Sequence, residues 1–293
     1  MSDDATVGEV LSRVLQASAD GSATFVLSSA HYEETYHRRD PASRRRLGQF
    51  MALVSRFNAI AGAPDLLEDE VHAQLARTGG LPERPVPLEK IFGRGAEHAF
   101  GNATDGGPTP SSVFGPWGAK GLREYGETEL LAGPEQELPH GRIALPTREY
   151  ADRQLAMELE TAGQLQEWGH DRDRAHRFVL AQEAQDAWAM AKILAPAVGI
   201  DLTGRADREF LTDFMLSLPA KGAVCRMRMT GHEDPNFRWH RNDLNDITAL
   251  GTAAAYCDVV VCEKHWGNVL RRHSAHLRAE VTSALPDLLD FLP

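Results

Sequence analysis

Three acidic side chains near the C-terminal end of the chain are placed where they could hold a metal cation. Asp243 and Asp246 are three residues apart at the start of a predicted helix, so both carboxylates lie on one helical face. The helix macrodipole favours negative charge in that first turn. Glu263 follows the β-branched run 259–261, which predicts a strand covered on both faces, as in a parallel sheet. Open α/β sheets place their ligands at this carboxyl end of a strand.

Each acid also has a purely structural interpretation. An acid in the first turn of a helix is most often a cap, and for Asp243 both interpretations stay open. Glu263 is followed by His265 and Trp266, an unusual position for a charge that only contacts solvent. Carboxylate oxygens are the ligands that hard cations such as Mg²⁺ prefer. The pattern therefore predicts a carboxylate site for Mg²⁺ or Mn²⁺.

A further acid, Glu34, lies near the N-terminal end in a similar context. Apolar residues at helical spacing over 7–15 predict a first helix, which Thr6 and Glu9 begin with a capping box. Residues 24–28 then predict a strand, and Glu34 lies on the helix that follows it. Glu34 therefore also lies just past the carboxyl end of a predicted strand.

The loop 231–241 mixes cations and aromatic rings. Arg238, Trp239 and Arg241 suit phosphate contact and base stacking, which predicts binding of a nucleic-acid substrate. The alternative is equally open: Trp239 anchors the loop in the core, and the arginines pair with nearby acids.

Composition narrows the class of protein. The chain has 293 residues, of which 42% are hydrophobic, so it can bury one large core or two modest ones. No apolar run reaches the roughly 20 residues of a membrane span, and we expect a soluble, cytoplasmic protein. A net charge of −11 argues against a broad electrostatic grip on nucleic acid but leaves room for a local basic patch. The three cysteines lack any CxxC spacing and predict free thiols.

The pattern along the chain predicts a discontinuous core with an insertion. Glycine and proline crowd residues 62–146, which predicts irregular structure, and helical periodicity returns at 150–159, 178–194 and 210–218. Residues 225–229 fit either a strand or a helix end. We therefore expect an α/β core formed by 1–60 and 225–293, with 61–224 as an irregular and helical insertion.

The order of these elements resembles the PIN domain, a family that includes the toxin ribonucleases of toxin–antitoxin modules. The resemblance rests on strand 25–29 with Glu34 after it, on the helix that carries Asp246, and on strand 259–261 with Glu263. It implies a three-layer α/β fold with a central parallel sheet, here with a large, mostly helical insertion. It also implies that Glu34, Asp246 and Glu263 are catalytic and hold Mg²⁺ or Mn²⁺ for phosphodiester hydrolysis, with Asp243 as an auxiliary ligand.

The sequence departs from the family at its start. PIN domains open with a hydrophobic strand that ends in a first metal-binding Asp, whereas only residues 1–5 precede the first predicted helix. Either the sequence begins too late or the protein has lost one ligand and one strand. The resemblance otherwise implies an RNA substrate, an antitoxin or other protein partner and a homodimer.

Two other classes of function fit the same sequence. One is a catalytically inactive protein that docks a partner through its helical insertion. The other is a zinc enzyme that uses the C-terminal histidines, although none of them has HExxH or another tight spacing. These histidines are His232, His240, His265, His273 and His276.

Overall fold

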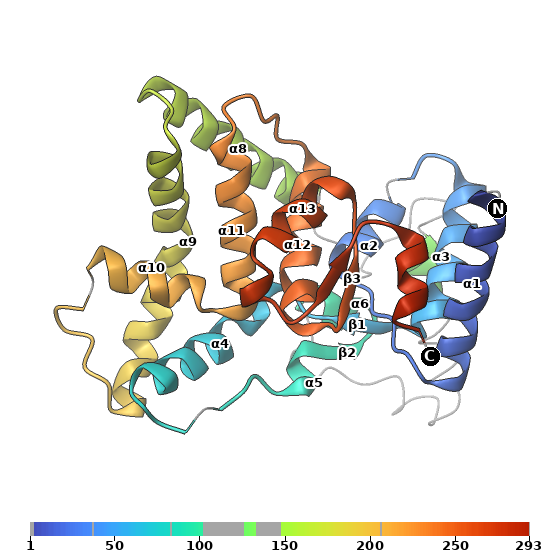
Figure 1. The fold of residues 1–293 in the computed structure, drawn as a ribbon, viewed down its shortest axis with the longest axis horizontal. Coiled ribbons are helices and arrows are strands. Elements are labelled where there is room, and N and C mark those ends of the chain that lie inside the picture. Colours follow the sequence, from blue (N-terminus) through green and yellow to red (C-terminus); the bar gives the residue numbers. More distant parts are fainter. Residues whose placement is uncertain are drawn as a thin grey trace. The chain divides into compact units, whose positions relative to one another are not determined.

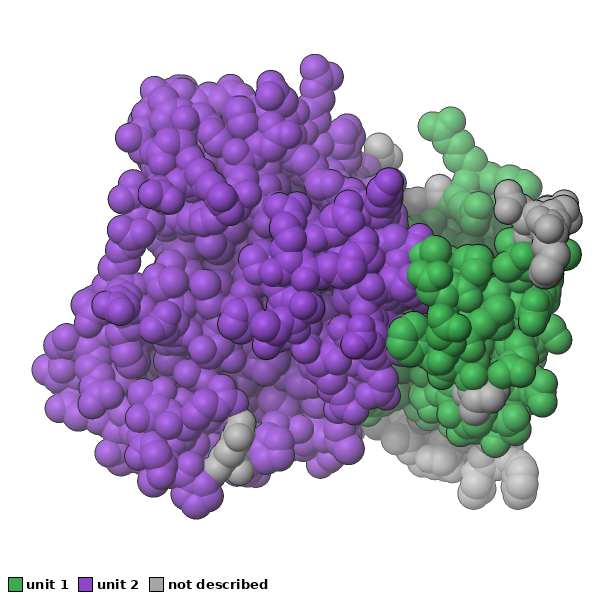
Figure 2. Space-filling model, viewed as in Figure 1, with its two compact units in different colours: residues 1–62, 92–147, 284–293 green, residues 63–91, 148–283 purple. Residues whose placement is uncertain are grey.

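The computed structural model describes residues 3–36, 38–82, 84–101, 126–132, 148–205 and 207–292. The chain divides into two compact units, coloured separately in Figure 2. Unit 1 comprises residues 1–62, 92–147 and 284–293, and unit 2 comprises residues 63–91 and 148–283. No helix in the described ranges is both long and apolar enough to cross a bilayer.

Unit 1 is built on an N-terminal helix, α1 (Asp3–Asp20), which buries one apolar stripe. Val10, Val14 and Ala17 of this stripe pack against Leu292, close to the 3₁₀ helix η3 (Leu285–Asp290). The unit also contains α2 (Ser29–Tyr36), α3 (Pro41–Ser55), β1 (Asn58–Ile60), β2 (Phe92–Arg94), α6 (Gly95–Ala99) and a helix at 126–132.

The bounds of helix α3 are set by specific capping residues. Asp40 is the N-cap, and its carboxylate accepts the backbone amides of Ala42 and Ser43. Pro41 occupies the first helical position, where its missing N–H costs nothing. The helix ends at Arg56, whose backbone adopts the left-handed conformation with φ 51°.

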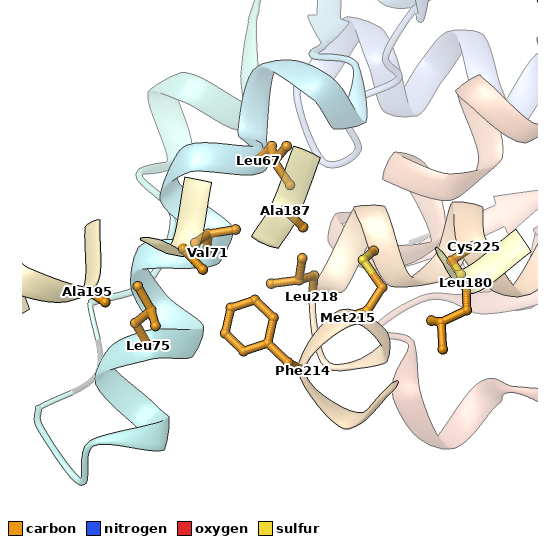
Figure 3. Packing of buried hydrophobic residues seen from close by; sticks show 11 residues of the cluster. Leu67, Val71, Leu75, Leu180, Ala187, Ala195, Phe214, Met215, Leu218 and Cys225 are labelled. Carbon is orange, nitrogen blue, oxygen red and sulfur yellow. The ribbon is translucent and has the colours of Figure 1, made fainter. Parts of the chain in front are cut away.

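Unit 2 is mostly helical, and α11 (Pro219–Glu233) lies between α9 (Arg172–Leu194) and α12 (Arg241–Tyr256) (Figure 1). One core joins α11 to α9, α10 (Arg208–Leu216) and α4 (Ala63–Thr78), through side chains such as Leu75, Phe214 and Leu218 (Figure 3). A second core surrounds Trp266. The remaining elements are α5 (Leu88–Ile91), α8 (Arg148–Glu167), η1 (Ala195–Val198), β3 (Val259–Val261), α13 (Lys264–Arg272), η2 (Ser274–His276) and β4 (Glu280–Thr282).

The predicted three-layer α/β fold with a central parallel sheet is wrong. The described residues form two small two-stranded sheets, β1 with β2 antiparallel and β3 with β4 parallel. The predicted strand 24–28 contributes a single bridge, Leu27 to Ala59. Among the described strands β3 pairs with one neighbour, and Val261 is 38% exposed, so the β-branched run is not buried on both faces. Helix packing supplies most of the core instead.

Two segments differ from their local prediction. Helix α4 lies in the region predicted to be irregular, because Leu66, Leu67, Val71 and Leu75 present one buried face. Residues 225–229 lie inside α11, which Pro219 begins at the first helical position. The predicted boundary between 224 and 225 therefore falls within one continuous helix. The predicted irregular stretches 102–125 and 133–147 lie outside the described residues.

Candidate functional site

Asp246 and Glu263 lie at the same end of the helix–strand pair formed by α12 and β3. The chain leaves α12 at Tyr256, turns through residues 257–258 and returns along β3. From Asp246 to Tyr256 the helix advances roughly 15 Å, and from residue 258 to 262 the strand advances roughly 13 Å. The two paths nearly match, so the start of α12 lies level with the end of β3.

The negative charges of both acids influence the pKa of the Cys262 thiol. Burial is the largest cause that raises its pKa, to about 11, and the negative charges of Asp246 and Glu263 both raise it further. The positive charge of Arg271 acts in the opposite direction. Glu263 is the sequence neighbour of Cys262, so the influence of Asp246 is the informative one: it indicates that α12 lies near the end of β3 at this level.

The two acids present their carboxylates differently. Asp246 is half-buried, whereas Glu263 is exposed and is the N-cap residue of α13. The Glu263 side chain makes no capping hydrogen bond. Its carboxylate is thus available to a ligand rather than committed to the helix terminus.

Asp243 has a structural role in the fold. Its Oδ2 accepts the backbone amide of His240 at 2.7 Å, which completes the reciprocal half of a capping box at the start of α12. This geometry is the capping interpretation that the sequence had left open for Asp243. The same carboxylate stays an auxiliary ligand only as a prediction.

Glu34 belongs to unit 1, whereas Asp246 and Glu263 belong to unit 2. It is exposed on α2, where its charge acts on its neighbour Glu33. Burial and then the charge of Glu34 raise the pKa of Glu33 to about 7. Glu33 was not predicted as a site residue. In the structure Glu33 is half-buried on α2, whereas Glu34 is exposed. Within the described ranges no three His, Cys, Asp or Glu side chains are grouped to hold a metal.

The predicted substrate-binding residues have different environments. Trp239 is only 4% exposed, and its ring packs against His232 at 4.7 Å and Phe237 at 5.0 Å between centroids. These contacts leave no ring face for a base, so the predicted stacking role of Trp239 is wrong: the ring anchors the loop in the core. Arg241 forms an ion pair with Asp152. Arg238 is exposed, and the structure gives it no hydrogen bond or ion pair within the described chain.

The C-terminal histidines do not gather into a zinc site in the described part of the chain. His232 is buried and lies 2.8 Å from Glu158, whereas His240 is 72% exposed beside Asp243. His265 stacks on Phe237. Burial first, and then neighbouring cations including Arg226, lower the pKa of His273. A cavity beside His170 and His232 has a volume of about 10 Å³, which is room for one water molecule.

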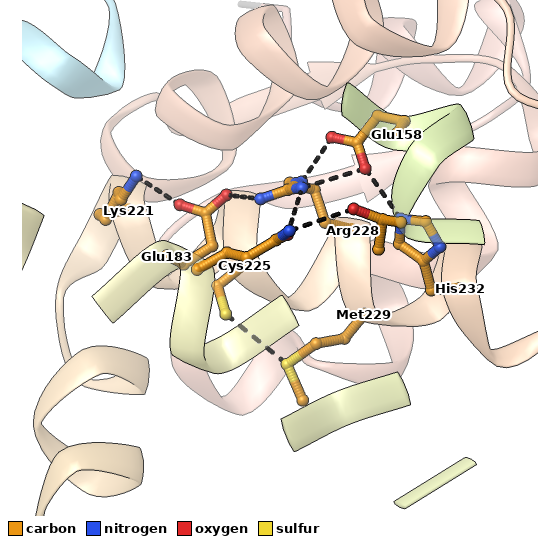
Figure 4. Close-up of polar contacts among 9 residues, drawn as sticks. Glu158, Glu183, Lys221, Cys225, Arg228, Met229 and His232 are labelled. Carbon is orange, nitrogen blue, oxygen red and sulfur yellow. Dashed lines mark hydrogen bonds and ion pairs between the residues drawn. The ribbon is translucent and has the colours of Figure 1, made fainter. Parts of the chain in front are cut away.

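A buried ion-pair network at the centre of unit 2 was not predicted (Figure 4). Glu158 on α8 and Glu183 on α9 both bind Arg228 on α11, and Lys221 also pairs with Glu183. Glu158 has its carboxylate 3% exposed. Burial acts to raise its pKa, but hydrogen bonds from His232 and Arg228 outweigh burial, so the pKa is lowered. These acids already have cationic partners, so they are not a second metal site.

A signal for this network existed in the sequence. Glu158 follows Leu155 by three residues, and Glu183 lies four residues from both Val179 and Ala187. A charge inside an otherwise apolar helical stripe predicts a buried ion pair rather than a solvated face.

Another buried acid, Glu70, joins three helices of unit 2. Its carboxylate accepts the amide of Ala220 at 2.7 Å, the amide of Lys221 at 3.2 Å and the hydroxyl of Tyr256 at 2.7 Å. The first two bonds satisfy the N-terminus of α11. Burial is the largest influence and raises the pKa of Glu70, although these hydrogen bonds act to lower it.

The donor set at Asp246 and Glu263 decides which metal it could hold. Two carboxylates supply hard oxygen ligands, and the raised pKa of Cys262 keeps its sulfur protonated and a poor ligand. Zinc sites generally need three or four protein ligands, whereas Mg²⁺ is commonly held by one or two carboxylates together with substrate phosphates. The residues therefore fit Mg²⁺ or Mn²⁺ and do not fit zinc.

Comparison with known proteins gives no relative: no family model, no curated protein and no solved structure matches this chain.

Proposed function

We propose that this chain is a Mg²⁺- or Mn²⁺-dependent nuclease that hydrolyses phosphodiester bonds in RNA, in the cytoplasm. The observation that supports the proposal is that Asp246 on α12 lies level with the end of β3, where Glu263 follows the strand. Two carboxylates leave coordination positions for water and for a phosphate oxygen. The three-layer fold is not part of this proposal.

Each residue has a distinct task. Asp246 is fixed on the second turn of α12, so it holds the cation in a constant position relative to the strand end. Glu263 lies on the exposed side, where the substrate enters. When bound, the metal activates water and neutralises charge on the phosphoryl oxygens. Arg238 is an exposed cation suited to a phosphate.

The test is hydrolysis of single-stranded RNA and DNA oligonucleotides with Mg²⁺, with Mn²⁺ and with chelator. We expect metal-dependent cleavage of RNA that Asp246→Asn or Glu263→Gln lowers about 100-fold or more. Asp258→Asn is the matched control, because Asp258 is an exposed acid at the opposite end of the same strand. Wild-type protein that cleaves nothing with either metal, or cleavage that survives Asp246→Asn, would reject the proposal.

A second candidate, a binding protein without activity, is favoured by one observation. The helix α8 and the turn after it expose large apolar side chains, with Met157 49%, Leu159 52% and Trp168 51% exposed. Such side chains could contact a protein partner such as an antitoxin. RNA that is bound without hydrolysis, or a co-purifying protein released by Trp168→Gln, would favour this candidate.

A further inference from the structure

Arg271 is held beside the end of β4 by neutral groups only. Its Nη1 donates to the carbonyl of Val281 at 3.2 Å and to the hydroxyl of Ser283 at 3.4 Å. Its Nη2 donates to Oδ1 of Asn268, one turn earlier on α13, at 2.7 Å. Three acceptors on two elements thus fix the orientation of an exposed guanidinium.

Several other arginines of unit 2 pair with carboxylates. Arg228 binds Glu158, Arg241 binds Asp152 and Arg278 binds Asp258. Within the described residues, the structure gives Arg271 no carboxylate in ion-pair range. A guanidinium carries five N–H groups. In the described part of the chain, these three hydrogen bonds leave two of the N–H groups, including the Nε–H, without a protein acceptor.

The fixed guanidinium lies at the same strand end as the candidate carboxylates. A Cβ atom added at Gly267 would overlap the Ser283 hydroxyl and would lie 3.4 Å from the Cys262 sulfur and 3.5 Å from Nη1 of Arg271. The hydroxyl, the thiol and the guanidinium therefore converge on one glycine. Arg271 also acts on the same thiol as Asp246 and Glu263, with opposite sign.

The chemistry of such a cation follows from what surrounds it. A guanidinium with unused donors and a fixed orientation binds phosphate oxygens, which match its planar fork. We propose that Arg271, oriented by Asn268 and Ser283, binds a backbone phosphate of single-stranded RNA; this inference rests on the proposed nuclease function.

A purely structural role for Arg271 makes a different prediction. If the guanidinium only ties α13 to β4, its removal should lower stability and leave the electrostatics of RNA binding unchanged. A lysine cannot reproduce three hydrogen bonds to separate acceptors, but it keeps the charge. Arg271→Gln and Arg271→Lys together therefore distinguish the hydrogen bonds that connect α13 to β4 from a contact with phosphate.

The experiment measures binding of a fluorescent single-stranded RNA at several salt concentrations, with Ca²⁺ in place of Mg²⁺. We expect Arg271→Gln to weaken binding about tenfold and to reduce the slope of log K against log salt by about 0.7. Arg271→Lys should keep the wild-type slope. Arg278→Gln is the matched control, because Arg278 is 58% exposed and paired with Asp258 at the far end of the strand.

The outcomes separate this inference from the nuclease proposal. A slope and affinity for Arg271→Gln equal to those of Arg278→Gln, or no binding of RNA by the wild-type protein, would overturn the inference even if cleavage occurs. A reduced slope that Arg271→Lys restores would support the inference even if no cleavage is found, and the nuclease proposal alone would then fail.

Discussion

Glu158 holds Arg228 with both carboxylate oxygens, Oε1 accepting from Nε at 2.7 Å and Oε2 accepting from Nη2 at 3.0 Å. The same Oε2 lies 2.8 Å from Nε2 of His232, so one buried acid joins α8 to two successive turns of α11. Because Arg228 also binds Glu183 on α9, the network connects three helices of unit 2.

Replacing Arg228 with methionine should destabilise the protein strongly. The substitution keeps the volume of the aliphatic stem but leaves Glu158 and Glu183 buried without their main cation. Breaking a buried ion pair in this way costs about 3–5 kcal/mol, measured by urea denaturation. The control Arg174→Met removes an exposed arginine whose pair with Asp171 is worth about 1 kcal/mol or less. Equal losses for the two variants would contradict the network's role.

Two buried glutamates should respond to pH with opposite sign. The pKa of Glu158 is lowered from its unfolded value of 4.5, so its charged form stabilises the fold above that value and the stability is lost as pH falls through the folded pKa. The pKa of Glu70 is raised, so the fold loses stability as pH rises from 4.5 through the folded pKa.

Glutamine variants make this contrast measurable. As pH rises from about 3 to about 6, Glu158→Gln should become more destabilising relative to wild type. As pH rises from about 4.5 to about 8, Glu70→Gln should become less destabilising. Glu160→Gln and Glu68→Gln change exposed acids on the same two helices and should show no such trend. Denaturation curves at several pH values give the sign directly, and parallel trends for both buried variants would refute it.

Gly267 should not accept a side chain. A Cβ atom there would overlap the Ser283 hydroxyl and press on Cys262, so Gly267→Ala should destabilise by about 1–3 kcal/mol. Gly163 is the matched control, because it lies within α8 with no heavy atom within 4 Å of its added Cβ. Gly163→Ala should stabilise by about 1 kcal/mol or less, because alanine favours a helix interior. Thermal denaturation of the two variants should therefore shift in opposite directions.

The sequence predicted local elements better than the way they assemble. The helix carrying Asp246 and the strand before Glu263 were both predicted, because helical spacing and a β-branched run are local signals. The prediction of a central sheet was wrong because tertiary packing decides which strands pair. In the described residues β3 pairs with β4, and the sequence pattern did not predict β4 as a strand.

The same distinction applies to the site residues. Asp246 and Glu263 lie at the same end of α12 and β3 because the chain reverses at residues 257–258, whereas the sequence predicted the helix and the strand but not this reversal. The burial of Trp239 depends on His232 and Phe237, which no spacing rule brings to its ring. Arg271 was not predicted as a site residue, because an arginine in the last turn of a helix is common. Its hydrogen bond to β4 is visible only in the structure.

The central claim is that Asp246 and Glu263 share the end of β3, and the Cys262 thiol tests it most directly. Alkylation rates resolved by peptide mass spectrometry between pH 7 and pH 11.5 would give the pKa of Cys262 and of Cys257, which serves as the internal control. Both thiols have a pKa raised to about 11, first by burial and then, at Cys257, by Asp258. Asp246→Asn and Glu263→Gln should each lower the pKa of Cys262 alone, and Asp258→Asn should lower that of Cys257 alone. A Cys262 pKa that Asp246→Asn leaves unchanged would contradict the shared site, because Glu263 acts on this thiol as its sequence neighbour in any case.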